Sequence, residues 1–141
     1  MTKKSHKLFV EDDFNFFLIG ISSHENDYRL SWAINTQLKM ALKRTENLQI
    51  HNPRIKQDQE FSLYQFTDPE TLLHYNLIAN RCDNGFLLEE MKNIDYVLKI
   101  TGDAGQNFPG LLADKLKKID IITTAFEINP AELKSKKKLL F

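Results

Sequence analysis

The stretch FNFFLIGIS at residues 14–22 decides the fold. It is rich in aromatic and β-branched residues and is too short for a helix of this composition, so we expect a central strand that is buried on both faces. The segment SSHEN at residues 22–26 follows it. There, Ser23 or Asn26 can accept a hydrogen bond from the free backbone N–H groups that begin a helix. The first regular elements are therefore a strand and then a helix.

The residues that follow predict a helix that begins at Asp27 and ends at about Arg44. Apolar residues spaced four, four and three apart line one face of this helix, namely Leu30, Ile34, Leu38 and Ala41. Asp27 lies near the start, and basic residues lie near the end, namely Lys39, Lys43 and Arg44. Both placements suit the helix dipole, which favours negative charge at the start and positive charge at the end.

The rest of the sequence predicts five more strands, a second main helix and a short terminal helix. The strands cover residues 48–50, 60–67, 71–80, 94–101 and 120–128, and the second helix covers residues 111–118. Asp68-Pro69-Glu70 predicts a hairpin turn, and Asn129 with Pro130 begins the terminal helix. We therefore expect an α+β protein with a single, mostly antiparallel sheet of five to six strands, two main helices packed on one face and a short C-terminal helix. The strand order stays open.

Composition and charge narrow the class of protein. The 141 residues suit one domain over residues 1–141. Nineteen basic and nineteen acidic residues cancel, which argues against a general nucleic-acid coat or a membrane-surface binder. No apolar run approaches the roughly 18 residues of a membrane span, and acidic residues 11–13 soon after the basic residues 1–6 do not suit a cleavable signal. One cysteine, Cys82, favours a reducing cytoplasm over a disulfide framework.

The segment at residues 88–96 carries a family resemblance. Its residues are Leu88-Glu89-Glu90-Met91-Lys92-Asn93-Ile94-Asp95-Tyr96. They resemble the signature of the IPExxxVDY family, an uncharacterised bacterial family: Leu88 stands at its Ile, Glu90 at its Glu, Ile94 at its Val, and Asp95-Tyr96 match outright, whereas Glu89 replaces the proline. FNFFLIGISS, DYRL and the tail TAFEINPAELKSKKKLLF also look like the family, so the resemblance covers nearly the whole chain. It implies a short, soluble, cytoplasmic bacterial protein, and it implies no activity.

The densest group of unusual side chains is DYRLSW, at the start of the first predicted helix. Arg29 and Trp32 lie three residues apart, so they share a helix face that is turned away from the apolar stripe. A guanidinium beside an indole can bind a carboxylate, a phosphate or a partner's aromatic ring, and both residue types are common interface anchors. The structural alternative is a Trp buried at the edge of the core and an Arg paired with Asp27 or Asp95.

Two other polar groups lack a full catalytic pattern. Glu89, Glu90 and Asp95 supply three carboxylates that could do acid–base chemistry, but we expect a solvated turn and a capping or ion-pairing aspartate instead. The loop TGDAG at residues 101–105 is not followed by the lysine of a phosphate-binding loop. Glycine there is better explained by a backbone with positive φ. We therefore assign no catalytic residue, although the sequence leaves open whether the protein is an enzyme.

Three further groups of residues were candidates for a site: the histidines, the single cysteine and the C-terminal residues. The histidines show no i,i+4 pair and Cys82 has no cysteine partner, so we expect no metal site and no cofactor. Cys82 and His74 form a nucleophile pair only if the fold brings them together, and a small buried cysteine is the simpler expectation. The lysines of residues 134–138 suit a solvated helix end. The apolar residues 139–141 are expected to pack on this chain or on a second one.

These features favour a non-enzymatic binding or adaptor module that acts through protein–protein contacts, with another protein or as a homodimer. The expected binding residues are Asp27, Tyr28, Arg29, Trp32, Asp95 and Tyr96. The alternative is a small enzyme or metabolite-sensing domain that binds a small anionic ligand in a pocket near Asp27, Arg29, Asp95 and Tyr96. RNA association through the lysines ranks third, because four positive charges on a neutral chain give weak non-specific affinity.

Overall fold

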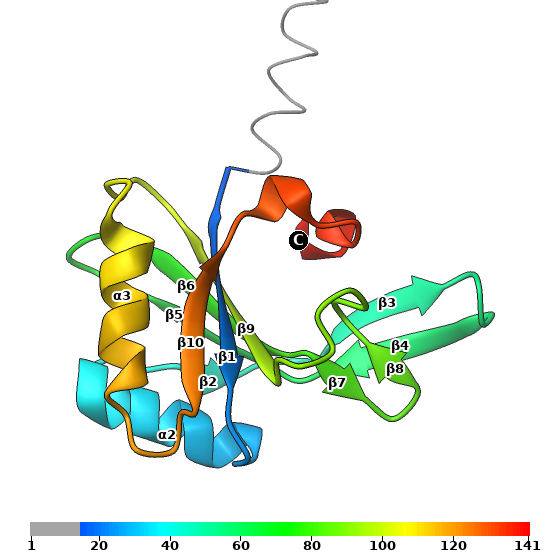
Figure 1. The fold of residues 1–141 in the computed structure, drawn as a ribbon, viewed down its shortest axis with the longest axis horizontal. Helices are drawn as coiled ribbons and strands as arrows, with labels where there is room; N and C mark the ends of the chain where they lie inside the picture. Colours follow the sequence, from blue (N-terminus) through cyan, green and yellow to red (C-terminus); the bar gives the residue numbers. More distant parts are fainter. Residues whose placement is uncertain (1–14) are drawn as a thin grey trace, which may run out of the picture.

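A computed structural model gives the fold and describes residues 15–141 of the chain (Figure 1). Phe14, the predicted first residue of the first strand, lies outside the described residues, as do the charged segments 1–6 and 11–13. Among the residues that are described, no helix is long and apolar enough to cross a membrane.

A six-stranded sheet forms the centre of the fold, in the order β10-β1-β9-β6-β5-β2, and every neighbouring pair is antiparallel (Figure 1). Its strands are β1 (Phe17–Ser22), β2 (Lys43–Arg44), β5 (Leu63–Thr67), β6 (His74–Ala79), β9 (Tyr96–Thr101) and β10 (Thr124–Ile128). With two α-helices, this sheet confirms the predicted α+β class and an antiparallel sheet of six strands. The prediction of a single sheet is wrong, because the predicted strand at residues 48–50 belongs to a separate two-stranded sheet. Residues 18–21 of β1 are all buried, as expected for a strand that is covered on both faces.

Strand β1 lies between two strands that are far apart in the sequence. Both β9 and β10 run antiparallel to β1, so they are parallel to each other. Helix α3 (Phe108–Lys117) connects them, because parallel strands need a long crossover. By contrast, β5 and β6 form a hairpin around the predicted turn at residues 68–70.

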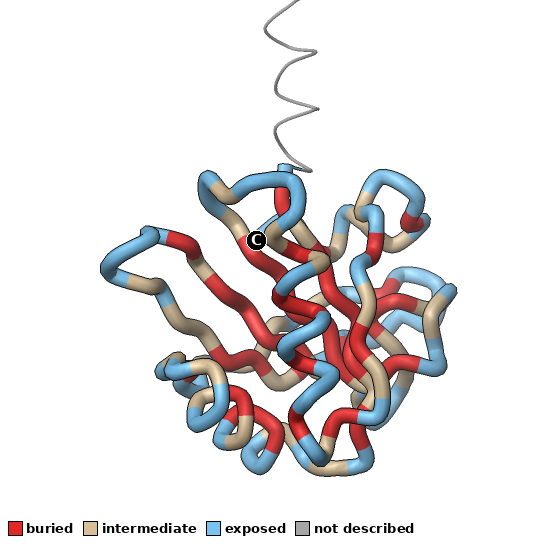
Figure 2. Tube along the Cα trace, turned by 60° about the vertical axis from the view of Figure 1, so that its left-hand side comes forward, coloured by how far each residue is buried: buried red, intermediate tan, exposed pale blue. Residues whose placement is uncertain are grey.

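The two faces of the sheet bury separate cores. One core joins strand residues such as Ile19 and Leu98 to buried residues of both helices, namely Leu30, Ile34, Leu112 and Leu116. The other core joins Leu18 and Val97 to residues outside the helices, namely Phe61, Leu87, Leu88, Leu133 and Leu139. Figure 2 shows buried stretches that run along the strands, with exposed residues at the connecting turns. The second face is thus covered by hairpins and loops.

Helix α2 (Asp27–Leu38) begins as predicted and ends early. The side chain of Asn26 accepts the N–H of Arg29 at 2.9 Å, which confirms Asn26 as the N-cap. The helix stops before Lys39, which has a left-handed backbone with φ of 58°. The Asn35 side chain then binds both backbone groups of Leu42, accepting from its N–H at 2.8 Å and donating to its carbonyl at 3.1 Å. The predicted end at Arg44 is therefore wrong, and Arg44 belongs to strand β2.

Two small hairpins lie beside the main sheet. The first pairs β3 (Leu48–Asn52) with β4 (Gln57–Phe61), and the second pairs β7 (Arg81–Cys82) with β8 (Gly85–Phe86). The prediction of one strand over residues 60–67 is wrong, because the chain changes sheets at Ser62: β4 pairs with β3, whereas β5 pairs with β6. The β3–β4 hairpin extends away from the main sheet (Figure 1).

The C-terminal segment forms two 3-10 turns, at Pro130–Glu132 and Lys136–Leu139, where a short α-helix was predicted. Asn129 caps the first turn by accepting the N–H of Ala131 at 3.1 Å. At the bend that follows, the Glu90 carboxylate accepts hydrogen bonds from the backbone N–H groups of Lys134 and Ser135. Leu139 is fully buried on this chain, whereas Leu140 and Phe141 stay partly exposed.

Candidate functional site

Helix α2 presents two large aromatic side chains to the exterior. Tyr28 is 68% exposed and Trp32 is 63% exposed, although Leu30 and Ile34 of the same helix are fully buried. With Arg29, Ala33 and Ile121 they line a groove of about 360 Å³. We call these residues the α2 surface: Tyr28, Arg29, Trp32, Ala33 and Ile121. Exposed aromatic residues beside an arginine are typical of binding surfaces.

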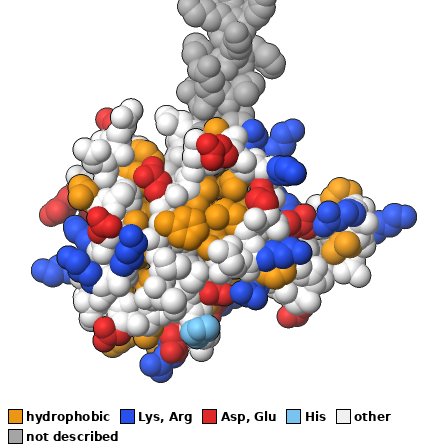
Figure 3. All heavy atoms as spheres, viewed as in Figure 1, with side chains coloured by type: hydrophobic (Ala, Val, Ile, Leu, Met, Phe, Trp, Pro, Cys, Tyr) orange, Lys and Arg blue, Asp and Glu red, His pale blue; other side chains and the backbone are white. Residues whose placement is uncertain are grey.

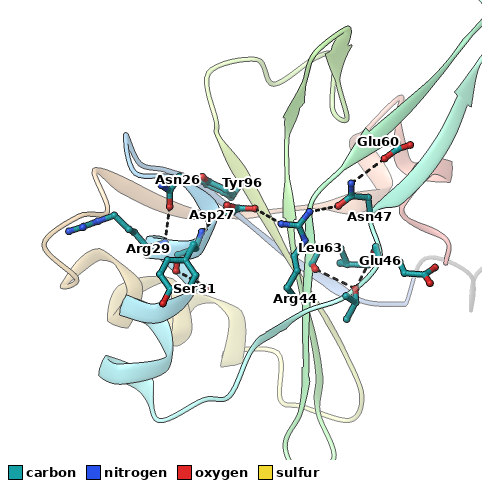
Figure 4. Close-up of polar contacts among 12 residues, drawn as sticks. Asn26, Asp27, Arg29, Ser31, Arg44, Glu46, Asn47, Glu60, Leu63 and Tyr96 are labelled. Carbon is teal, nitrogen blue, oxygen red and sulfur yellow. Dashed lines mark hydrogen bonds and ion pairs between the residues drawn. The ribbon is translucent and has the colours of Figure 1, made fainter.

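Arg29 contributes to this surface. Its Nε lies 2.9 Å from Oε1 of Glu25, one helical turn earlier, and its side chain remains 66% exposed. Figure 4 shows Arg29 extending away from Asp27 and Tyr96. The structural alternative of a buried Trp and an Arg paired with Asp27 or Asp95 is therefore wrong, because Trp32 is exposed and Glu25 is the partner of Arg29.

Asp27 connects the start of α2 to the edge of the sheet. One carboxylate oxygen accepts the backbone N–H of Tyr28 at 2.8 Å, and the other lies 3.3 Å from the Arg44 guanidinium. Arg44 also donates to Asn47 at 2.6 Å, and Asn47 donates to Glu60 (Figure 4). These polar contacts hold α2 against β2 and the segment that follows it, so Asp27 has a positioning role.

Asp95 and Tyr96 make structural contacts to residues near the start of α2 and to Arg81. The Asp95 carboxylate accepts the N–H of Ser23 at 2.8 Å and pairs with Arg81 at 2.9 Å. The Tyr96 hydroxyl donates to the carbonyl of Glu25 at 2.7 Å. Burial, with the nearby carboxylates of Asp27 and Asp95, raises the pKa of Tyr96 to about 12, so this hydroxyl stays protonated as a donor.

The structure separates the four residues of the expected pocket, and Asp27 lines neither of the two cavities in which the other three lie. Asp95 and Tyr96 line a cavity of about 420 Å³ with Glu25 and Arg81. Arg29 lines the α2 surface instead. The predicted binding residues therefore fall into one exposed group, made of Tyr28, Arg29 and Trp32, and one group that secures the ends of α2, β1 and β9.

The segment at residues 88–96 is held by polar contacts to distant parts of the chain. Asn80, which is fully buried, accepts the N–H of Leu88 at 2.7 Å and donates to the carbonyls of Met91 and Ile94 at 2.9 and 3.0 Å. Sequence reasoning missed Asn80, since nothing local distinguishes it from a surface asparagine. The residues that carry the family resemblance thus have structural contacts in this fold.

Glu89 and Glu90, which were expected on a solvated turn, both have partners. Glu89 pairs with Arg54 at 2.5 Å. Glu90 accepts the Ser135 hydroxyl at 2.6 Å and its N–H at 3.0 Å. Burial would raise the pKa of the Glu90 carboxyl, but the hydrogen bonds from Ser135 and Lys134 outweigh it and hold that pKa below its ordinary value.

The remaining reactive side chains have local partners. Cys82 donates to the Asn84 side chain at 3.1 Å, and Nδ1 of His74 lies 2.6 Å from the Thr67 hydroxyl. Within residues 15–141, no group of three or more His, Cys, Asp or Glu side chains could hold a metal ion. Gly102, in the loop between β9 and α3, has the positive φ predicted for it, at 125°.

Two lysines near the C-terminus donate hydrogen bonds to backbone carbonyls of this chain. Lys138 donates to the carbonyl of Leu87 at 3.0 Å, and Lys136 donates to the carbonyl of Ala131 at 3.4 Å. On the face in Figure 3, basic and acidic side chains are interspersed around a central hydrophobic patch. Nucleic-acid binding surfaces more often carry a continuous basic stripe.

Fold and surface together define a small α+β protein with an antiparallel sheet and an exposed aromatic helix face. Comparison with protein-family models, with curated proteins and with solved structures found no match. The function therefore has to be inferred from the geometry of the chain itself.

Proposed function

We propose that this protein is a non-enzymatic binding module whose α2 surface docks a segment of a partner protein. The observation that carries the proposal is the exposure of Tyr28 and Trp32 side by side with Arg29 on one helix face. Exposing large aromatic side chains to water is unfavourable, and covering them with a partner lowers the free energy. Aromatic and arginine anchors in a groove are the residues from which interface hot spots are built.

The chemistry of the groove defines the partner segment. Trp32, Ala33 and Ile121 favour an apolar side chain, and the Arg29 guanidinium favours a carboxylate next to it. The Glu25–Arg29 pair lies on the surface, where such pairs contribute little free energy. A partner carboxylate can therefore bind the Arg29 guanidinium together with Glu25 or in place of it. The same complementarity applies to a second copy of the chain, so a homodimer is one outcome of the test.

The test compares the wild type with Trp32→Ala and Tyr28→Ala. Leu111→Ala is the matched control, because Leu111 is a similarly exposed apolar residue, 61%, on the other helix. Each tagged protein is recovered from its own host after nuclease treatment, and bound proteins are quantified. Truncating a hot-spot residue typically costs about 2 kcal/mol or more, so we expect at least about a tenfold loss of the partner with Trp32→Ala. Leu111→Ala should retain it.

Sedimentation of the purified protein separates the homodimer from a second protein. A dimer that Trp32→Ala dissociates assigns the groove to a second copy. A monomer with a partner lost in Trp32→Ala assigns it to another protein. Equal recovery of the same partner by wild type, Trp32→Ala and Tyr28→Ala contradicts the proposal.

Two further assignments belong to the same proposal, and two alternative functions stand beside it. The matches at residues 88–96 support membership of the IPExxxVDY family, and the single cysteine supports a cytoplasmic location. The metabolite-sensing alternative would use the cavity of Asp95 and Tyr96, and it predicts a ligand that raises the melting temperature of wild type. RNA association predicts binding that is lost when residues 134–138 are deleted and that falls steeply with salt.

A further inference from the structure

A second cavity lies between the two helices, away from the α2 surface. It has a volume of about 470 Å³ and lies between the end of α2, helix α3 and strand β6. Its apolar lining comes from both helices and the residues next to them, namely Leu38, Met40, Phe108, Leu112 and Ile119. Small-molecule sites commonly have about this size and an apolar lining with few polar groups.

Three lysines surround this cavity: Lys39, Lys115 and Lys118. All three are exposed, and within the described part of the chain none of their ammonium groups has an ion pair or a hydrogen bond. One carboxylate, that of Asp68, also lines the cavity, but it accepts the N–H of Glu70 at 2.8 Å within its own turn. The cavity therefore has an excess of positive charge at its mouth.

Tyr75 adds a polar group to the lining of the same cavity. Only 4% of this residue is exposed, and its ring stacks on Phe66 with the centroids 6.0 Å apart. Among residues 15–141 the Tyr75 hydroxyl has no hydrogen-bond partner, although Tyr75 lines the cavity. No buried side-chain N or O atom of the described residues lacks a partner, so this hydroxyl reaches solvent through the cavity, where it is free to donate a hydrogen bond to a ligand. Burial and the nearby Asp68 raise the pKa of Tyr75, so the hydroxyl keeps its proton.

We propose that this cavity binds a small amphiphilic anion. The apolar body of the ligand lies on Leu112 and Ile119, and its carboxylate or phosphate accepts hydrogen bonds from Tyr75 and the lysines. The dipole of α3 accounts for lysines near the end of that helix. The dipole of α2 likewise accounts for Lys39, which directly follows that helix, but neither dipole accounts for the meeting of lysines from two helices with the Tyr75 hydroxyl at one cavity. A common ligand accounts for all of them.

The test titrates the full-length protein with anilinonaphthalenesulfonate, a fluorescent apolar anion, and then displaces it with decanoate, decyl phosphate or decanol. We expect the two anions to displace the probe at concentrations at least about tenfold lower than decanol, because ammonium groups favour charged acceptors. The anion that binds more tightly identifies the group as carboxylate or phosphate. Displacement by decanol at the same concentration as both anions overturns the proposal.

Substitutions of cavity residues test whether the probe binds in the cavity. Lys115→Gln with Lys118→Gln should weaken binding several-fold, and Tyr75→Phe should weaken it about tenfold, since a hydrogen bond to a charged group is lost. Lys43→Gln with Lys117→Gln is the matched control, because it removes the same charge outside the cavity and should leave binding unchanged. Thermal unfolding of each variant verifies that it is folded.

Trp32→Ala separates this proposal from the protein-binding function. It should leave probe binding unchanged, because Trp32 lines the other groove. Binding that is lost in Trp32→Ala and kept in Tyr75→Phe and in the Lys115, Lys118 double variant assigns the probe to the α2 surface and overturns the proposal. If Trp32→Ala loses its protein partners and still binds the probe, the result supports both the protein-binding function and the anion site.

Discussion

The ammonium of Lys99, a residue that is only 3% exposed, donates a hydrogen bond to the carbonyl of Leu139 at 2.6 Å. It also lies 4.1 Å from the ring centroid of Phe141 and 5.0 Å from that of Phe16. Burial lowers the pKa of Lys99, because the charged form is poorly solvated there. This lysine on β9 thereby connects the sheet face that has no helix to the C-terminal residues.

Replacing Lys99 with Met is expected to release the C-terminal turns without unfolding the protein. Met keeps the length and apolar character of the side chain but cannot donate to Leu139. The lost hydrogen bonds are offset by removal of a desolvated charge, so we expect the free energy of unfolding to change by less than about 1.5 kcal/mol. Limited proteolysis should cut residues 134–141 faster than in wild type. Equal cutting rates would show that Lys99 does not hold this segment.

Glu90→Gln is expected to reduce the loss in the free energy of unfolding that occurs as the pH is lowered. The folded protein lowers the pKa of Glu90 below its ordinary value of 4.5, so its contribution is present above pH 4.5 and is lost as the pH falls through the folded pKa. Because Glu90 is exposed, we expect that contribution to be only about 1 kcal/mol at neutral pH.

Urea unfolding between about pH 6 and pH 3 measures this effect, and wild type should lose more stability than Glu90→Gln over that range. Glu70→Gln is the control, because Glu70 is an exposed glutamate of a turn whose carboxylate has no partner among the described residues. Its profile should run parallel to wild type. Parallel profiles for Glu90→Gln as well would contradict the prediction.

Asn80→Ala is expected to be the most destabilising polar substitution. It leaves the N–H of Leu88 and the carbonyls of Met91 and Ile94 without their partner, in a fully buried place. A loss of about 3 kcal/mol or more in the free energy of unfolding follows. Asn93→Ala changes an exposed asparagine of the same loop and should cost less than about 0.5 kcal/mol. Similar losses for the two variants would rule out the anchoring role of Asn80.

Two glycines are expected to respond to alanine in opposite directions. A Cβ at Gly20 in strand β1 would lie 3.0 Å from Cδ1 of Ile128 and 3.2 Å from Cδ1 of Ile94, so overpacking should cost about 1–3 kcal/mol. Gly110 in helix α3 has open space around it, and Gly110→Ala should stabilise the protein by about 0.5 kcal/mol through helix propensity. Chemical unfolding of both variants measures the signs. A neutral Gly20→Ala would mean that the core around β1 is loosely packed.

Much of the fold was predictable because its signals are local. The buried strand at β1, the cap at Asn26 and the hairpin of β5 with β6 each depend on residues close together in the sequence. The end of α2 was not predictable, because the Asn35 side chain ends the helix by binding Leu42 seven residues later. The break at Ser62 was also hidden, since Phe61 and Leu63 are both buried and continue the apolar pattern.

In the candidate site, too, the local arrangement was predictable from the sequence and the long-range contacts were not. Helical spacing alone placed Arg29 and Trp32 together on the face opposite the apolar stripe. The sequence could not show that Asp95 holds Ser23 and Arg81, or that Tyr75 and Lys39 line one cavity, because these residues meet only after the sheet has formed.

By itself, the sequence determined the α+β class, the order of the main elements and the cap at the start of α2, since hydrophobic periodicity and capping act within a few residues. Only the tertiary structure decided the strand order, the burial of Asn80 and Lys99 and the cavity between the helices. The physical reason is that a buried polar group needs a partner, and the chain supplied those partners from residues 8 to 42 positions away.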